Sequence, residues 1–140
     1  MEILKKVESL LPKEVVSKIE LEGSEIIVYT KDREFFKTCE ELIKQVVNEI
    51  KKRIEVRLER DLCLEEEAAK QRIKEIVPEE AKIKDIYFEP ERSIVIIAAE
   101  KPGLVIGKGG ETFRKIKSET LWSPRIERVP PLKSDVIIGI

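Results

Sequence analysis

The chain has 140 residues and a formal net charge of −1, with 39% charged and 41% hydrophobic residues. This length predicts one domain of ordinary size or two small ones, and the hydrophobic share suffices for a packed core. No stretch reaches the roughly 18–20 apolar residues of a membrane span, and the N-terminus lacks the apolar run of a signal peptide. We therefore expect a cytoplasmic protein with no membrane contact. The abundance of Lys and Glu is typical of proteins from hot environments.

The sequence contains no pattern typical of a metal site or an acid–base site. There is no histidine, and Cys39 and Cys63 stand alone rather than in a Cys-x-x-Cys pair. We interpret both cysteines as small packing residues. No arrangement of carboxylates indicates a catalytic pair. The sequence therefore predicts no metal, no cofactor and no enzymatic activity for this chain.

Positive charge is concentrated late in the sequence. Residues 1–100 contain 19 Lys and Arg against 24 Asp and Glu, whereas residues 101–133 contain 8 against 3. A local basic region matters more for phosphate binding than the total charge does. The distribution favours nucleic-acid binding by the later part of the chain, although a charge run alone is usually a solvated face.

Hydrophobic periodicity predicts six elements in the first half. An apolar helical face repeats from Ile3 to Leu11, and Pro12 ends that helix. Two strands, a short helix capped by Asp32, a longer helix and a half-exposed strand follow, over residues 15–21, 25–30, 34–37, 42–50 and 54–58.

The same order is predicted again in the second half. A helix over 64–77 ends at Pro78, and strands over 83–88 and 93–99 flank the turn Pro90-Glu91-Arg92. A glycine-rich segment follows, with a short helix before it and a longer one running to about Leu121. The last predicted element is a strand over 125–129.

The two halves can be laid over one another. Leu11-Pro12-Lys13-Glu14 matches Val77-Pro78-Glu79-Glu80, and Ile26–Tyr29 matches Ile94–Ile97. Each half then reads α-β-β-α-α-β, with helices packed on one face of a three-stranded sheet. We expect an α+β fold with a first unit over 1–60 and a second over 61–131. Residues 132–140 would be a tail or the start of a further domain.

Three glycines fall within four positions in Gly107-Lys108-Gly109-Gly110, directly after the apolar triplet 104–106 and where a helix begins. Glycines uncover backbone N–H groups, and a helix start carries partial positive charge, so a phosphate is the favoured guest. The spacing fits neither a Walker loop nor a dinucleotide-binding fingerprint. It resembles the Gly-x-x-Gly loop of the KH domain, which clamps about four single-stranded nucleotides. A glycine-rich turn without a ligand is the alternative.

The order of elements likewise resembles the type II KH fold, so the resemblance implies two tandem type II KH units. At the position of the loop the first unit has Lys37-Thr38-Cys39-Glu40, which contains no glycine and carries a carboxylate that would repel phosphate. We expect the first unit to act as a scaffold for the second. Extension of the RNA-binding surface is the alternative.

Over roughly residues 1–131 the chain resembles the N-terminal region of the archaeal cleavage and polyadenylation specificity factor-like ribonucleases, which are β-CASP enzymes of the metallo-β-lactamase superfamily. The match is carried by residues 76–81, 85–88, 101–111, 122–125 and 129–131. It implies binding of single-stranded, U-rich RNA and its presentation to a zinc-dependent nuclease domain in RNA processing or transcription termination. That domain needs histidine ligands, which this chain lacks. The family tends to have a glycine before the tryptophan, where this chain has Leu121, so we expect the end of that helix to be built differently.

The candidate RNA-binding residues belong to the loop and its flanking helices. They are Gly107, Lys108, Gly109, Gly110, Arg114, Lys115 and Lys117, with Val105 and Ile106 as an apolar lining. Each helix cation has a solvated position as its alternative, and both apolar residues have a core position. Trp122 either stacks on a base or, as we favour, belongs to the core.

Three functional hypotheses are open. The first is a tandem KH module that binds single-stranded RNA through its second unit. The second is a protein-interaction or dimerisation module with a vestigial loop, although the sequence gives no other indication of a homo-oligomer. The third keeps RNA binding but places the chain in transcription control, as in NusA, which also carries tandem type II KH domains.

Overall fold

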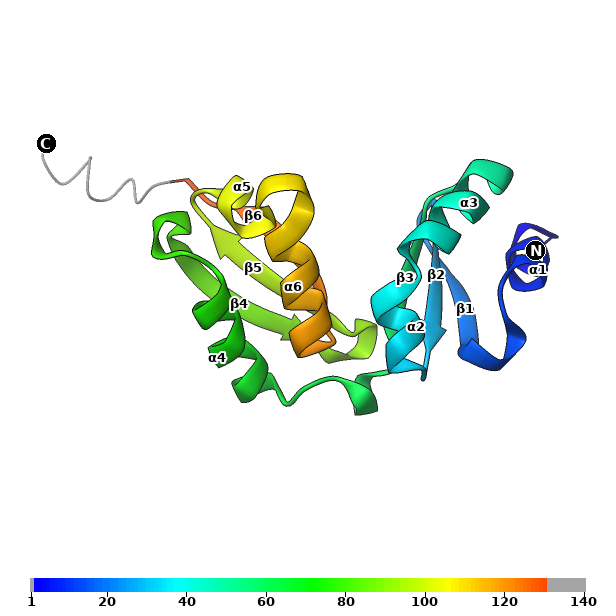
Figure 1. Cartoon of the computed structure of the whole chain (residues 1–140), viewed down its shortest axis with the longest axis horizontal. Helices are drawn as coiled ribbons and strands as arrows, with labels where there is room; N and C mark the ends of the chain where they lie inside the picture. Colours follow the sequence, from blue (N-terminus) through cyan, green and yellow to red (C-terminus); the bar gives the residue numbers. More distant parts are fainter. Residues whose placement is uncertain (1, 131–140) are drawn as a thin grey trace, which may run out of the picture.

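The computed structural model describes residues 2–130, which form two three-stranded sheets with their helices (Figure 1). The first unit contains α1 (Glu2–Leu10), β1 (Val16–Glu22), β2 (Glu25–Thr30), α2 (Arg33–Thr38), α3 (Glu40–Ile50) and β3 (Ile54–Leu58). The second contains α4 (Glu66–Ile76), β4 (Ile83–Glu89), β5 (Ile94–Ala99), α5 (Pro102–Ile106), α6 (Glu111–Thr120) and β6 (Ser123–Arg128). The α+β fold and its repeated order are confirmed. The tail expected over 132–140 lies outside the described residues.

Both sheets have the same topology. In each, the middle strand pairs antiparallel with the strand before it and parallel with the strand after it, giving the orders β1-β2-β3 and β4-β5-β6. The first strand of each sheet also has an irregularity at the same place, between Val16 and Lys18 and between Ile83 and Asp85. Because a bulge sets the local twist of a strand, its recurrence shows that the two units repeat in detail.

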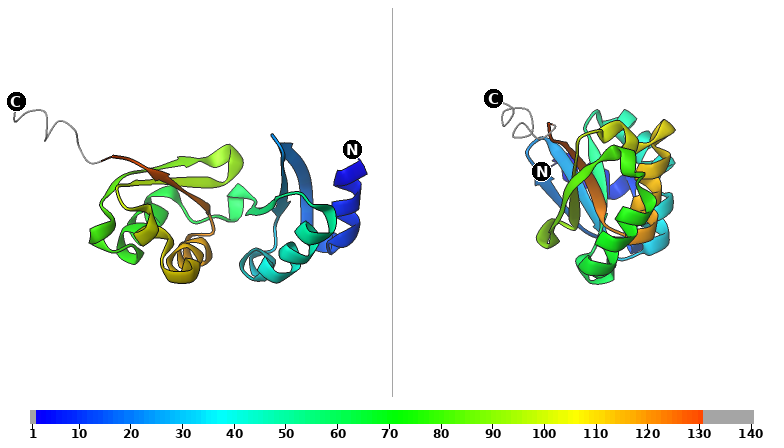
Figure 2. Two further views of the ribbon diagram at one scale, coloured as in Figure 1. Left: turned by 90° about the horizontal axis from the view of Figure 1, so that it is seen from above. Right: turned by 90° about the vertical axis from the view of Figure 1, so that its left-hand side faces the viewer.

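Each sheet buries one face under its helices (Figures 1 and 2). Ile26 and Val28 of β2 lie in the first hydrophobic core, and Val95 and Ile97 of β5 lie in the second. Inward-facing residues alternate along a strand, so Ile26 corresponds to Val95. The alignment of Ile26 with Ile94 expected from the sequence is therefore wrong by one residue.

The segment between the units is fastened to the end of α6. The N–H of Leu64 donates to the carbonyl of Thr120 at 3.0 Å, and its own carbonyl accepts from the indole Nε1 of Trp122 at 2.7 Å. Trp122 is 2% exposed and meets Phe88 edge-on, with ring centroids 4.8 Å apart. The ring is therefore part of the core rather than a platform for bases.

Cys63 and Leu121 connect the two cores beside this segment. Cys63 contacts both cores, and burial raises the pKa of its thiol to about 12, in keeping with a packing role. Leu121 packs against the first core and ends α6 in a left-handed conformation, with φ 65° and ψ 12°. The backbone turns there as a glycine would, at a cost of about 1 kcal/mol for leucine. Leu121 therefore adopts the left-handed backbone that glycine favours at a helix end, and the expected difference from the family stays a prediction.

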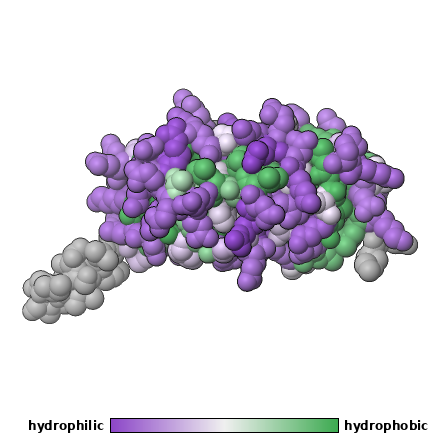
Figure 3. Space-filling model, turned by 90° about the horizontal axis from the view of Figure 1, so that it is seen from below, coloured by the Kyte–Doolittle hydropathy of each residue, from purple (hydrophilic) through white to green (hydrophobic). Residues whose placement is uncertain are grey.

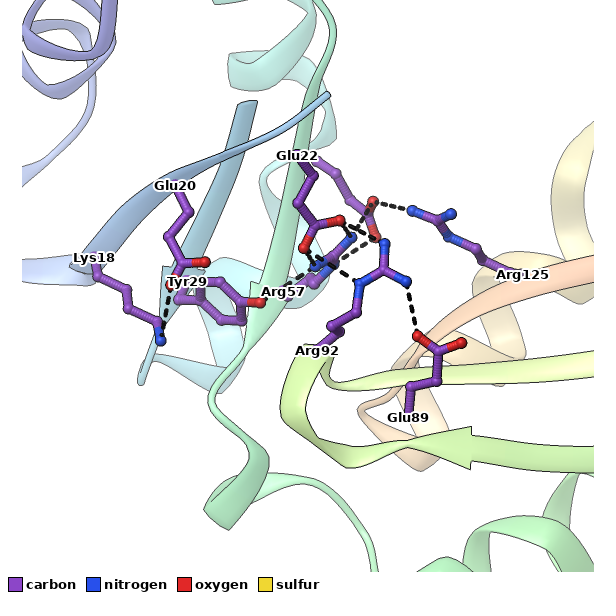
Figure 4. Close-up of polar contacts among 9 residues, drawn as sticks. Lys18, Glu20, Glu22, Tyr29, Arg57, Glu89, Arg92 and Arg125 are labelled. Atoms are coloured by element: carbon purple, nitrogen blue, oxygen red, sulfur yellow. Dashed lines mark hydrogen bonds and ion pairs between the residues drawn. The ribbon is translucent and has the colours of Figure 1, made fainter. Parts of the chain in front are cut away.

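An ionic cluster also joins the units, on the face of the first sheet away from its helices (Figure 4). Arg57 is fully buried and donates to both carboxylate oxygens of Glu22, at 2.6 and 2.9 Å, as well as to Glu55 and Tyr29. From the turn before β5, Arg92 donates to Glu22 at 2.6 Å. Hydrogen bonds from Arg57 and Arg92 lower the pKa of Glu22 to about 2. One carboxylate thus accepts from an arginine of each unit and holds them together.

The surface carries many hydrophilic residues, as Figure 3 shows for one face. No helix among residues 2–130 is long and apolar enough to cross a membrane. The same residues contain no cluster of three or more Cys, Asp or Glu side chains arranged to hold a metal ion.

Candidate nucleic-acid interface

The four-residue segment between α5 and α6 has an unusual backbone. Gly107, Gly109 and Gly110 all have positive φ angles, of 80°, 63° and 80°. Gly107 combines its φ with a ψ of 170°, a region open essentially to glycine alone. A Cβ atom on Gly107 would also collide with the hydroxyl of Thr112 and lie 2.8 Å from the backbone nitrogen of Thr112. Gly107 is therefore required for the loop to fold back against the start of α6.

The outer side of the loop is open. A Cβ atom on Gly109 would meet nothing within 4 Å, and one on Gly110 would meet only the guanidinium of Arg114, at 3.1 Å. Helix α6 follows directly, and no side chain among the described residues 2–130 caps its N-terminus. Its positive end, with amides that lack a side-chain acceptor, lies beside the exposed Lys108. This arrangement suits an anion that approaches the backbone closely.

The two apolar candidates before the loop have different positions. Val105 is fully buried in the second core, so its side chain does not reach the surface. Ile106 is 41% exposed, and Leu104, which the sequence analysis did not single out, is 39% exposed. The sequence allowed either a core position or a position in the apolar lining for these residues. Val105 lies in the core, whereas Ile106 lies at the surface.

The cationic candidates on α6 also separate. Arg114 is exposed and lies next to the loop, whereas Lys115 is exposed on a part of the helix that does not share the groove described below. Lys117 reaches across to the first unit, where its ammonium lies 4.6 Å from the centroid of the Phe36 ring. This cation–π contact ties α6 to α2.

A groove of about 750 Å³ runs between the two units beside the loop. From the second unit it is lined by residues that include Ile106, Gly110, Phe113 and Arg114. Of Phe113, Ile116 and Thr120, only the last two are buried. Helical periodicity puts these three residues on one face of α6, but it does not distinguish a core position from a groove position.

The first unit has a tight joint where the second has its loop. Helices α2 and α3 are separated by Cys39 alone, which has a right-handed backbone with φ −83° and ψ −1°. The carbonyl of Cys39 accepts the N–H of Ile43 at 2.9 Å, and its side chain is 5% exposed. Burial raises the pKa of this thiol, as expected for a packing residue. The joint offers no glycine-lined backbone to a ligand.

Comparisons with known proteins find a KH model that matches each half of the chain. A family model described as "Transcription termination factor FttA, KH domain" matches residues 1–63, and a KH domain model matches residues 69–120. A solved structure described as "Crystal structure of APE1850" aligns with 91% of the chain at 17% identity and a TM-score of 0.36, too weak a likeness to bear on the fold.

Three curated relatives are named Transcription termination factor FttA. The chain is 45% identical to that of Methanothermobacter thermautotrophicus over 137 residues, 44% to that of Pyrococcus abyssi over 135, and 43% to that of Methanocaldococcus jannaschii over 140. These matches cover 96–99% of this chain but only 21–22% of each relative. The chain thus spans about a fifth of the length of these relatives. Matched in each half by a KH model, and folded twice in the same α-β-β-α-α-β order, it consists of two tandem type II KH domains.

Proposed function

We propose that the chain is a single-stranded RNA-binding module of a transcription termination factor, and that its second KH domain holds the RNA. The observation that carries this proposal is the Gly107–Gly110 loop, whose three positive-φ glycines open the backbone at the uncapped start of α6. A KH domain uses such a loop to clamp about four nucleotides. The names of the curated relatives support the link to termination.

Binding would use the backbone more than the side chains. Loop and first-turn amides donate to phosphate oxygens, and Lys108 adds a mobile positive charge beside them. The bases of these nucleotides then lie against the second domain, near Ile106 and Phe113. Because phosphate neutralisation releases counterions, the affinity falls as salt rises.

The finer parts of the proposal concern the parent protein. The resemblance to archaeal β-CASP ribonucleases supports a preference for U-rich RNA and delivery of that RNA to a nuclease domain elsewhere in the protein. Within this chain we assign residues 1–60 to the first domain and 61–131 to the second. This proposed boundary falls between the end of β3 at Leu58 and the start of α4 at Glu66. The test is cleavage of U-rich RNA by the full-length protein, which a defective loop should reduce.

Binding of labelled U-rich and mixed single-stranded RNA, measured by fluorescence anisotropy at two salt concentrations, tests the central step. The loop variant combines Lys108→Asp with Gly109→Asp. Both residues are exposed, and a side chain introduced at position 109 would meet open space, so we expect the variant to fold. Its affinity should fall at least about tenfold, because a phosphate contact is replaced by repulsion.

The chain offers a matched control far from the loop in sequence. Gly23 has a φ of 62°, close to the 63° of Gly109, and also faces open space, while Lys5 is an exposed lysine of α1. Lys5→Asp with Gly23→Asp makes the same chemical changes, and we expect RNA affinity to stay within about twofold of the wild type. If the loop variant binds as well as this control, the loop is not the clamp and the interaction-module hypothesis leads.

A further inference from the structure

The groove between the domains has two walls, and one belongs to the domain without a glycine loop. On the second domain's side it is lined by residues of α5, α6 and β6. On the first domain's side it is lined by residues of α2, α3 and β3 and by Cys39, which joins the two helices. The tight joint at Cys39 therefore faces the same space as the end of the loop at Gly110.

The charges around the groove are mostly positive. Lys44 pairs with Glu40 at 3.6 Å and Arg125 with Glu55 at 3.4 Å, which accounts for both carboxylates. Lys37 and Arg114, one from each domain, have no ion-pair partner within residues 2–130. The groove thus has unneutralised cations on both walls, which suits a polyanion lying between them.

The floor of the groove is apolar. Ile43, Ile54 and Val56 line it from the first domain, and Phe113 and Ile126 from the second. Apolar and aromatic surface beneath a cationic rim is the combination on which proteins stack bases while holding phosphates. A volume of about 750 Å³ lies within the range of sites that enclose a small organic group.

We propose that the first KH domain supplies the second wall of the RNA site. Nucleotides beyond those held by the loop enter the groove between the domains. Lys37 contacts one of their phosphates, Lys44 neutralises the neighbouring carboxylate of Glu40, and a base lies against Ile43 and Phe113. This inference rests on the proposed function and adds to it, because it gives the domain that lacks a glycine loop a direct part in binding.

The test is a pair of charge-reversed variants with a labelled U-rich RNA of about eight nucleotides, twice the number that a KH loop holds. Lys37→Glu with Lys44→Glu changes the groove. Lys5→Glu with Lys6→Glu changes two exposed lysines on α1, which lies at the end of the first domain away from the second (Figure 1). Circular dichroism checks that each variant is folded, and Lys37→Ala with Lys44→Ala replaces the first pair if reversal weakens α3.

We expect the groove variant to bind at least about tenfold more weakly and the α1 variant to stay within about twofold of the wild type. The slope of log affinity against log salt should become shallower by about 0.7 for the groove variant, because the phosphate contact of Lys37 on a single strand is lost. In wild-type protein the methyl resonances of Ile43 and Ile54 should shift with RNA, and that of Ile3 on α1 should not.

The outcomes separate this inference from the proposed function. If the loop variant Lys108→Asp with Gly109→Asp loses binding while the groove variant binds like the α1 variant and the Ile43 methyl is unmoved, the inference is overturned and the loop stands alone. The first domain's wall of the groove would then be left for a protein partner. If wild-type protein binds no RNA, both proposals fail.

Discussion

Each KH domain has its own three-stranded sheet, with the same bulge in its first strand, and its own core. The two domains differ in the segment between their two central helices. In the first domain one right-handed residue, Cys39, joins α2 to α3. In the second domain four residues join α5 to α6, and three of them have positive φ angles. Both long helices nonetheless bury equivalent positions, Val46 and Ile50 in α3 and Ile116 and Thr120 in α6. The fold is therefore complete without the loop, which is the reason that we propose a ligand-binding role for this glycine segment.

A second difference lies at the ends of the two hairpins. Glu22 pairs with the first residue of β2 and Glu89 with the first residue of β5, so these carboxylates occupy equivalent positions. Arg92 contacts both of them, but only Glu22 also binds the buried Arg57. In the first domain the hairpin-end carboxylate, Glu22, therefore contacts the second domain through Arg92. The equivalent carboxylate of the second domain, Glu89, contacts Arg92 within its own domain.

The largest effect should come from adding a methyl group to the loop. Gly107→Ala should destabilise the second domain by about 2–4 kcal/mol, because positive-φ strain adds to overpacking against Thr112. Urea unfolding followed through Trp122, the single tryptophan of the chain and a residue of the second core, measures this. Gly109→Ala is the control and should cost only about 1 kcal/mol, since its Cβ meets open space. Equal costs would mean that the contact with Thr112 does not shape the loop.

The converse change in the first domain should have a smaller effect. Cys39→Gly should destabilise the protein by about 1–2 kcal/mol, because the joint loses a buried side chain and gains backbone freedom. RNA affinity should not rise, since a glycine in a one-residue joint does not create a loop. Thermal unfolding by circular dichroism and the anisotropy assay measure the two results. A gain in RNA binding would contradict the view that the two domains differ because of loop length and not because of glycine alone.

The smallest effect should be the acid response of Glu22. Its folded-state pKa of about 2 lies below its ordinary value of 4.5, so its contribution is complete above pH 4.5 and is lost as pH falls toward 2. The difference in unfolding free energy between wild type and Glu22→Gln should shrink by about 1 kcal/mol across that window, because solvent screens part of the interaction. Urea titrations of both proteins at pH 5 and 2.5 measure it. A difference that stays constant with pH would remove Glu22 from the link between the domains.

Local patterns account for most of what the sequence predicts. The strands and helices follow from alternation, helical periodicity and the breakers Pro12, Pro78 and Gly23. The loop at Gly107–Gly110 follows from glycine spacing, and the lack of glycine at Lys37–Glu40 predicts the different joint. These features are encoded within a few residues, and the structure reproduces them.

The groove is formed by residues that lie far apart in the sequence, and for that reason sequence patterns do not predict it. Its walls depend on how the domains sit, and the contact of Glu22 with Arg92 joins residues 70 positions apart. Neighbouring apolar residues also have different fates that hydrophobicity does not distinguish, as Val105 in the core and Ile106 on the surface illustrate. The contact of Lys117 cannot be predicted from the sequence either, because only folding brings its ammonium to the ring of Phe36.

Amide chemical shifts of the full chain, recorded as U-rich single-stranded RNA is added at low salt, test the central claim most directly. We predict the largest changes within residues 103–117, centred on Gly107–Gly110, and their loss in the variant that combines Lys108→Asp with Gly109→Asp. An RNA titration that leaves residues 103–117 unshifted would contradict the assignment of the loop as the RNA clamp.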